Sequence, residues 1–130
     1  MNAIDVMNTP IVAASPNASA REIALYMLLG GFSGVPIADA SGSLVGIVTE
    51  LDLIRALRLG KALEHVVVSD IMTCDVVTVD VSTPIEEIMR ILECEHILRV
   101  PVMREGRMVG IVSRPDLLRA VVEPNFIRIG

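Results

Sequence analysis

Apolar residues along the chain follow two different spacings, and each spacing predicts one kind of secondary structure. Two stretches, about residues 20–30 and 84–95, repeat apolar positions at intervals of three and four, which is typical of a helix with one buried face. The residues on these faces are Ile23, Ala24, Met27 and Leu28 in the first stretch, and Ile85, Ile88, Met89 and Leu92 in the second. A shorter amphipathic helix is predicted after each, with apolar faces of Leu53, Ala56 and Leu57, and of Leu117, Ala120 and Val121.

Short β-branched runs between these helices predict buried strands. They are GVPIA and LVGIV around the turn ADASGS, and RVPVM and MVGIV around the turn REGR. Gly42 and Gly106 supply the flexible residue that such turns need. An extended stretch precedes each long helix, PIVAAS in the first case and DVVTVDV in the second.

Local signals predict where the long helices start and stop. Thr83 is expected to cap the second long helix, with Pro84 at its first position and Glu86 three residues after the cap. The pair Gly30-Gly31 is expected to end the first long helix.

Every predicted element occurs twice, because the chain is an internal repeat. Met7 aligns with Met72 at an offset of 65, and after one deletion Gly42 aligns with Gly106 at an offset of 64. The copies cover about residues 3–58 and 68–122, each reading β-α-β-β-α. We therefore predict an α+β fold of two repeats packed with pseudo-two-fold symmetry. The expected division is 1–64 for the first repeat with its linker, and 65–130 for the second with a short C-terminal tail.

Composition excludes several classes of function. The chain has 130 residues, 52% of them hydrophobic, but only 2% aromatic and no Trp. Its net charge of −5 and the lack of any Lys or Arg run argue against nucleic-acid and anionic-membrane surfaces. The N-terminus lacks the apolar core of a signal peptide, and no stretch is long enough to span a membrane. With two cysteines that form no ligand pair, Cys74 and Cys94, we expect a cytoplasmic protein without a bound metal.

The last motif of each repeat carries the candidate chemistry. GIVTELDL in the first copy and GIVSRPDL in the second place a hydroxyl and a carboxylate three residues apart after an apolar strand. One interpretation is structural, since Thr49 with Asp52, or Ser113 with Asp116, can form a helix-capping box. The other is functional: a helix N-terminus attracts phosphate, a hydroxyl can donate to it, and a carboxylate can accept from ribose hydroxyls. The two interpretations are compatible.

Three motifs, repeated in the same order, resemble the CBS domain, named after cystathionine beta-synthase. They are DVMNTP/DIMTCD, SGVPI/LRVPV and GIVTELDL/GIVSRPDL. Tandem CBS domains, called Bateman modules, are regulatory. The resemblance implies adenosine-containing ligands such as AMP, ADP, ATP or S-adenosylmethionine in the inter-repeat cleft, and assembly into a homodimer. We expect the effector to be a separate protein, because the repeats fill almost the whole chain.

The resemblance also assigns roles to particular residues. Thr49, Asp52, Ser113 and Asp116 match the positions that contact phosphate and ribose. The positions that face adenine are matched by Val35, Pro36 and Ile47 in the first copy and by Val100, Pro101 and Ile111 in the second. All six apolar residues can equally be ordinary core.

The two copies differ in charge. Residues 31–55 have a formal charge of −2, whereas the aligned residues 96–119 have a formal charge of +3. Arg99 stands where the first copy has Gly34, and the resemblance implies a phosphate contact there, since some nucleotide-sensing relatives use an Arg at this place. Arg114 lies beside Ser113, and its guanidinium also suits a phosphate. The remaining arginines of that window are equally compatible with solvated surface charge: Arg104, Arg107 and Arg119. The second copy is therefore predicted to bind the phosphorylated ligand more tightly.

Two functions remain open at the level of sequence. The favoured one is a ligand sensor that signals to a partner. The alternative is a structural dimerisation module with degenerate sites, which Gly34 and Glu50 in the first copy keep open. An enzyme is not expected, since no catalytic triad, metal cluster or paired acid and base is evident. His65 and His96 are interpreted as surface or turn residues.

Overall fold

The computed structural model describes residues 1–9 and 11–122. The chain divides into two compact units. The unit that holds the body of the first repeat comprises Ile11–Val77 and Glu105–Met108, and we call it the first-repeat unit. The other comprises Met1–Pro10, Thr78–Arg104 and Val109–Gly130, and we call it the second-repeat unit. Pro10 and the expected C-terminal tail, residues 123–130, lie outside the described residues.

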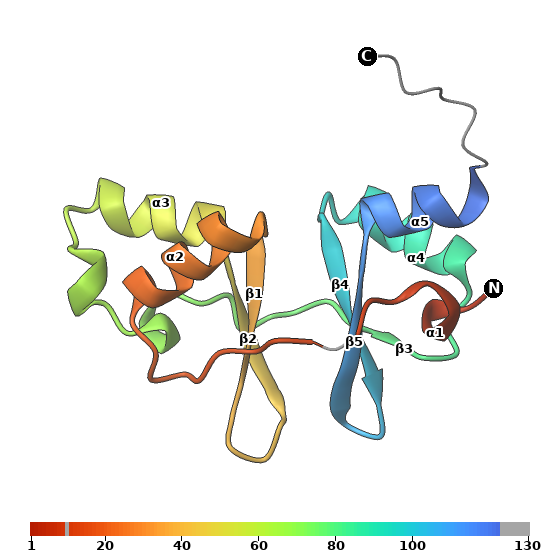
Figure 1. The fold of residues 1–130 in the computed structure, drawn as a ribbon, viewed down its shortest axis with the longest axis horizontal. Coiled ribbons are helices and arrows are strands. Elements are labelled where there is room, and N and C mark those ends of the chain that lie inside the picture. Colours follow the sequence, from red (N-terminus) through yellow and green to blue (C-terminus); the bar gives the residue numbers. More distant parts are fainter. Residues whose placement is uncertain (10, 123–130) are drawn as a thin grey trace. The chain divides into compact units, whose positions relative to one another are not determined.

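The first-repeat unit is a hairpin with two helices (Figure 1). Its elements are α2 (Ala20–Gly30), β1 (Gly34–Ala38), β2 (Leu44–Thr49) and α3 (Glu50–Arg58), followed by two single 3₁₀ turns, Leu63–His65 and Val68–Asp70. β1 and β2 are antiparallel, with Pro36 opposite Ile47. The buried core is aliphatic and comes from both helices, both strands, the second turn and the link before that turn: Ala20, Ile23, Met27, Val35, Ile37, Val48, Leu53, Val66 and Val68.

The second-repeat unit repeats this arrangement and adds a short helix from the N-terminus (Figure 1). Its elements are α1 (Ala3–Val6), β3 (Val79–Asp80), α4 (Ile85–Cys94), β4 (Arg99–Arg104), β5 (Arg107–Ser113) and α5 (Arg114–Val121), except that the first two residues of β5 are grouped with the first-repeat unit. The sheet order is β3-β4-β5, with β3 parallel to β4. The α+β fold class and the two repeats predicted from the sequence are confirmed.

The turn chemistry follows the sequence closely. Gly42 and Gly106 have φ of 85° and 80°, the left-handed conformation that glycine adopts without steric cost. Gly31 ends α2 with φ of 70°. The aligned residue after α4 is His96, which adopts φ of 52° in the helix-to-strand turn where it was expected.

The first strand of each repeat is much shorter than predicted. In the first repeat it is a single bridge, in which the Ala14 N–H donates to the Pro36 carbonyl at 2.9 Å and the Ala38 N–H donates to the Ala14 carbonyl at 3.0 Å. Continuing this parallel ladder toward the N-terminus would need an N–H on Pro36, which proline lacks. Pro101 takes the same place opposite β3, so both ladders stop at the Val-Pro step.

The predicted cap of the second long helix is wrong. α4 begins at Ile85, with Pro84 at the cap position and no side-chain cap. The Thr83 hydroxyl instead accepts from the Asp80 N–H at 3.0 Å, which closes the turn before the helix. The Ile85 N–H donates to the Met1 carbonyl at 3.1 Å, so the N-terminal segment does the capping.

Each predicted helical face is only partly covered. Ile23 and Met27 of α2 are buried, but Leu28 is 80% exposed. In the other three helices, too, a residue of the predicted face is exposed: Leu57, Met89 and Val121. The periodicity located the apolar surface correctly, but the described parts of the chain cover only one side of it.

The segments that lead into the two repeats are exchanged, because each packs on the repeat that it does not precede. We call residues 3–8 (AIDVMN) and 68–73 (VSDIMT) the lead-in segments. The first packs on the second repeat, where a Cβ on Gly110 would lie 2.5 Å from the Met7 sulfur. The second packs on the first repeat, where a Cβ on Gly46 would lie 2.6 Å from the Met72 sulfur. The closing-motif glycines thus make room for a methionine, which the sequence interpretation did not foresee.

Alanine at these two glycines is expected to destabilise the protein unequally. Gly46→Ala would also bring the Cβ to 2.9 Å from the Thr73 carbonyl oxygen, whereas the atoms nearest Gly110 all belong to the flexible Met7 side chain. We expect Gly46→Ala to cost about 2 kcal/mol of unfolding free energy, and Gly110→Ala to cost less, because backbone yields less readily than a methionine. Urea denaturation of both variants measures the difference. Equal losses would contradict this packing.

Candidate functional site

The closing motif of the second repeat is built around a buried carboxylate. Ser113 ends β5 and caps α5, and Asp116 is only 5% exposed in the first turn of that helix. The Ser113 N–H and hydroxyl both donate to Asp116 Oδ2 at 2.7 Å. The Asn8 side-chain amide donates to the same oxygen at 2.7 Å, and the Arg119 guanidinium pairs with Oδ1.

These contacts decide the ionisation of Asp116. Burial alone raises the pKa of this carboxyl, but the hydrogen bonds from Asn8, Ser113 and Arg119 outweigh it, and the net pKa is lowered. Asp116 is therefore a carboxylate at neutral pH. An ionised group that can accept hydrogen bonds is what a ribose diol requires.

The lowered pKa makes part of the stability dependent on pH. The folded pKa of Asp116 lies below the unfolded value, so its stabilisation is present above about pH 4 and is lost as pH falls toward the folded pKa. We expect the unfolding free energy of the wild type to fall more steeply with acid than that of Asp116→Asn. Urea titrations between neutral and acidic pH test this. Parallel curves would show that Asp116 contributes nothing to acid sensitivity.

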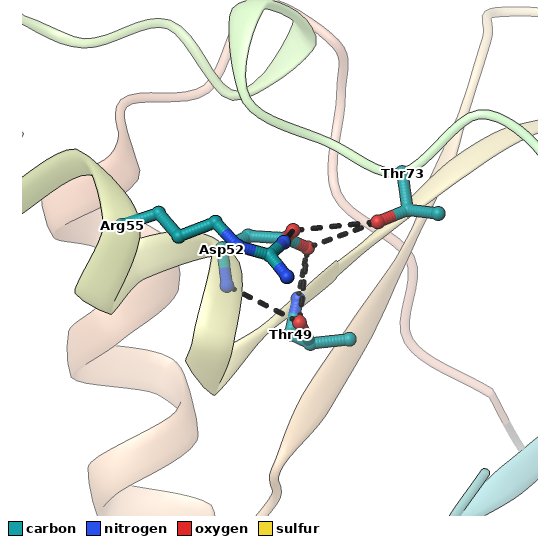
Figure 2. A network of polar contacts seen from close by, with 4 residues as sticks. All are labelled: Thr49, Asp52, Arg55 and Thr73. Carbon is teal, nitrogen blue, oxygen red and sulfur yellow. Dashed lines mark hydrogen bonds and ion pairs between the residues drawn. The ribbon is translucent and has the colours of Figure 1, made fainter. Parts of the chain in front are cut away.

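The closing motif of the first repeat has the same design with weaker contacts (Figure 2). Thr49 caps α3, and its N–H and hydroxyl donate to Asp52 Oδ2 at 2.8 and 3.0 Å. The Thr73 hydroxyl lies 3.3 and 3.4 Å from the two oxygens of the carboxylate, and Arg55 lies 3.4 Å from Oδ1. Asp52 is also 5% exposed.

Besides Arg55, which the alignment pairs with Arg119, the sequence analysis missed two residues of these clusters, Asn8 and Thr73. Each lies in a lead-in segment and contacts the carboxylate of the opposite repeat. A signal for them was present, because Asn8 and Thr73 occupy aligned positions, directly after the identical Met7 and Met72. The alignment shows their equivalence, but it cannot show that each serves the other copy.

Main-chain donors at the two helix starts are less available than expected. The Arg114 N–H donates to the Leu98 carbonyl at 3.1 Å, and Pro115 has no N–H. In the first repeat the Glu50 N–H donates to the Ser33 carbonyl at 3.1 Å. A phosphate at these helices would therefore depend on the hydroxyl, on guanidinium groups and on the helix dipole rather than on a free first N–H.

The arginines of the second repeat fall into two groups. Arg114 follows Ser113, where its Nε donates to the Ile97 carbonyl at 3.0 Å, and Arg119 contacts Asp116 directly. Arg99 begins β4 and is half-buried. Arg104 and Arg107 flank the β4–β5 turn. Arg107 is six residues from Ser113 along an extended strand, which is about 20 Å. Arg104 and Arg107 therefore lie outside the cluster around Asp116.

The residues expected to face adenine are mostly core. Val35, Pro36, Val100 and Pro101 are buried, whereas Ile47 and Ile111 are half-buried. In the first-repeat unit, Val35 also lines a cavity of about 500 Å³. Its wall also includes the apolar or aromatic residues Val12, Ala14, Ile23 and Tyr26 and the polar residues Ser15, Asn17 and Glu22. Its volume is within the range of small-molecule sites, but its lining residues do not include Pro36, Ile47, Thr49 or Asp52.

No group of three or more metal-ligating side chains occurs among residues 1–9 and 11–122. Within the same ranges, no helix combines the length and apolar character that a membrane crossing requires.

The sequence profile of the CBS domain matches the chain twice, at residues 3–59 and 68–123. The chain belongs to the CBS domain family. Its two CBS repeats are similar to the uncharacterized protein MK0525 of Methanopyrus kandleri, with 32% identity over 125 residues, which is 95% of this chain and 63% of that protein. The chain thus spans less than two thirds of that relative's length.

Solved structures of CBS pairs are similar over most of the chain. One is the CBS domain pair of protein MJ0100 in complex with 5′-methylthioadenosine and S-adenosyl-L-methionine (30% identity, TM-score 0.83, covering 92% of this chain and 94% of that one). Another is CBSX2 in complex with AMP (26% identity, TM-score 0.80, covering 92% and 94%). These CBS pairs have adenosine-containing molecules bound.

Proposed function

We propose that this CBS pair is a regulatory module that binds adenosine-containing ligands of the AMP, ADP or ATP type and signals their presence to a separate partner protein. The observation that carries the proposal is the buried, ionised Asp116 beside the Ser113 hydroxyl at the start of α5. This pairs an acceptor for ribose with a donor for phosphate.

The chemistry of binding follows from the present hydrogen bonds. The Ser113 hydroxyl donates to Asp116 without ligand, but it can rotate to donate to a phosphate oxygen. That rotation frees an acceptor position on Oδ2 for a ribose hydroxyl. Arg119, whose side chain is largely exposed, can leave Oδ1 for a second ribose hydroxyl and turn to a phosphate.

Adenine would contact the Val-Pro strands. Pro36 stops the ladder at Ala14, and Ala14 and Val35 also line the cavity of the first-repeat unit. In this proposal the apolar part of the cavity wall, which includes Val12 and Tyr26, contacts the flat base. The bound ligands of the MJ0100 and CBSX2 structures support adenosine as the shared part of the ligand, including S-adenosylmethionine as a further candidate.

The second closing motif is proposed to bind the phosphorylated ligand more tightly. Its Arg114 occupies the position aligned with Glu50, and its Arg99 the position aligned with Gly34. A guanidinium beside the hydroxyl attracts a phosphate, whereas the Glu50 carboxylate repels it.

A panel of ligands separates this function from its alternatives. Thermal unfolding of the full chain would be followed with AMP, ADP, ATP, adenosine and S-adenosylmethionine, and small molecules carried through purification would be identified by mass spectrometry. Stabilisation by at least one adenosine compound, but not by GMP or inorganic phosphate, supports the sensor. No stabilisation by any of them would favour the structural module.

The exposed apolar face of α2 supports a homodimer, whether the protein is a ligand sensor or a structural module. Leu28 and Leu29 of α2 are 80% and 87% exposed. Leu25 of the same helix and Ile54 of α3, which contacts α2, are also exposed. α2 carries no charged residue after Glu22. An uncharged apolar face is self-complementary, so a second copy of the same face is the proposed partner.

A further inference from the structure

The first lead-in segment is anchored on the second repeat at both of its ends. The Ala3 N–H donates to the Thr83 carbonyl at 2.8 Å, and Ala3 is fully buried. The Ile4 N–H donates to the Val81 carbonyl at 3.1 Å. The segment therefore has a fixed position from which its last residue, Asn8, can act.

Asn8 contacts the candidate site in two ways. Its backbone pairs with Ile111, donating at 2.9 Å and accepting at 3.3 Å. Its side-chain amide donates to Asp116 Oδ2 at 2.7 Å. One residue outside the second repeat thus contacts both the strand proposed to meet adenine and the carboxylate proposed to bind ribose.

The second lead-in segment makes the same contacts with the first repeat. Thr73 pairs with Ile47 through the backbone, donating at 2.8 Å and accepting at 2.9 Å. Its hydroxyl reaches both oxygens of Asp52. Because the same arrangement occurs in both repeats, we interpret it as a structural feature of the site rather than an accidental contact.

We propose that Asn8 and Thr73 are positioning residues of the ligand sites, each orienting the ribose-binding carboxylate of the opposite repeat. This inference rests on the proposed function. An asparagine NH₂ can only donate, so it holds Oδ2 of an ionised Asp116, while Oδ1 becomes available to a ribose hydroxyl when Arg119 turns away from it. Each lead-in segment is thereby coupled to ligand binding, because the bound ligand and the docked segment both depend on one oriented carboxylate.

The contact from Asn8 to Asp116 is stronger than the contact from Thr73 to Asp52. The repeat with the more positive charge therefore also has the more firmly held carboxylate. Asn8 makes one short hydrogen bond of 2.7 Å, whereas the Thr73 contacts of 3.3 and 3.4 Å are long. Asp116 is therefore the better-oriented carboxylate before ligand arrives. Preorganisation of this kind strengthens binding by removing an ordering cost.

The test uses AMP as the probe and the full chain throughout. Asn8→Ala is expected to weaken AMP binding about 10-fold, as expected for one lost hydrogen bond to a charged group, in isothermal titration calorimetry. Asn8→Thr, which installs the residue found at the matching position, is expected to restore part of the loss. Thr9→Ala, an exposed neighbour, is the matched control and is expected to bind like the wild type.

Two readouts separate positioning from a general loss of structure. In the Asp116→Ala background, Asn8→Ala is expected to change AMP binding by less than about 2-fold, since the two act through one contact. Without ligand, NMR titration of the Asp116 carboxyl is expected to show a higher pKa in Asn8→Ala and no change in Thr9→Ala.

The outcomes also distinguish this inference from the function on which it rests. An Asn8→Ala protein that binds AMP as tightly as wild type would overturn the positioning role while leaving the sensor intact. The positioning role would also be overturned if Asn8→Ala weakened AMP binding equally in the wild-type and Asp116→Ala backgrounds. If the wild type binds no adenosine compound, both proposals fail, whatever the NMR titration of Asp116 shows.

Discussion

The Ser113→Ala/Asp116→Ala variant is expected to lose the tighter of two AMP sites. Two hydrogen bonds to charged groups are removed together, one to phosphate and one to the carboxylate, which corresponds to about 100-fold weaker binding. Isothermal titration calorimetry of the full chain with AMP measures this loss. Circular dichroism and urea unfolding would accompany it, because the same change removes the capping box of α5 and costs about 1 kcal/mol of stability.

The matched control is Thr49→Ala/Asp52→Ala, which removes the same chemistry from the first repeat. A smaller loss is expected there, since Glu50 replaces the arginine beside the hydroxyl. Equal losses from the two variants, or a larger loss from the first-repeat variant, would contradict the predicted preference for the second repeat.

Leu28→Glu/Leu29→Glu is expected to convert a dimer into a monomer. Both side chains are more than three-quarters exposed on α2, and two charges on a self-paired apolar face would be buried without partners. Light scattering coupled to size-exclusion chromatography measures the mass directly. Because neither side chain belongs to the core of the first-repeat unit, we expect the free energy of unfolding of the monomer to change little apart from the lost dimer contacts.

The second repeat offers the control for this experiment. Glu93 and Cys94 occupy the positions aligned with Leu28 and Leu29, so Glu93→Lys changes an already charged site and is expected to leave the dimer intact. A wild type that is monomeric at high concentration, or a double variant that remains dimeric, would show that the α2 face is not the interface.

The repeat made much of the fold predictable from sequence. The hairpins, the turn glycines and the capping boxes at Thr49 and Ser113 depend on residues within a few positions of one another, and local chemistry determines them. The shortened first strands could also have been derived, because Pro36 and Pro101 each remove the N–H that a longer parallel ladder needs.

The exchange of lead-in segments could not be predicted in the same way. An internal repeat shows that Met7 and Met72 are equivalent. The sequence does not determine which of the two methionines packs against Gly46 and which against Gly110. Asn8 and Thr73 were missed for the same reason. Similarly, the periodicity of α2 marks Leu28 as apolar, but coverage by a neighbour is a property of the assembled surface.

The most direct test of the central claim is a calorimetric titration of AMP into the wild-type full chain, alongside adenosine and GMP. The two closing motifs predict saturable binding of AMP and weaker binding of adenosine, because adenosine lacks the phosphate contacts. The adenosine compounds bound in the MJ0100 and CBSX2 structures lead us to expect weaker binding of GMP. A folded protein that gives no binding heat with AMP, ADP, ATP or S-adenosylmethionine across several temperatures would contradict the account.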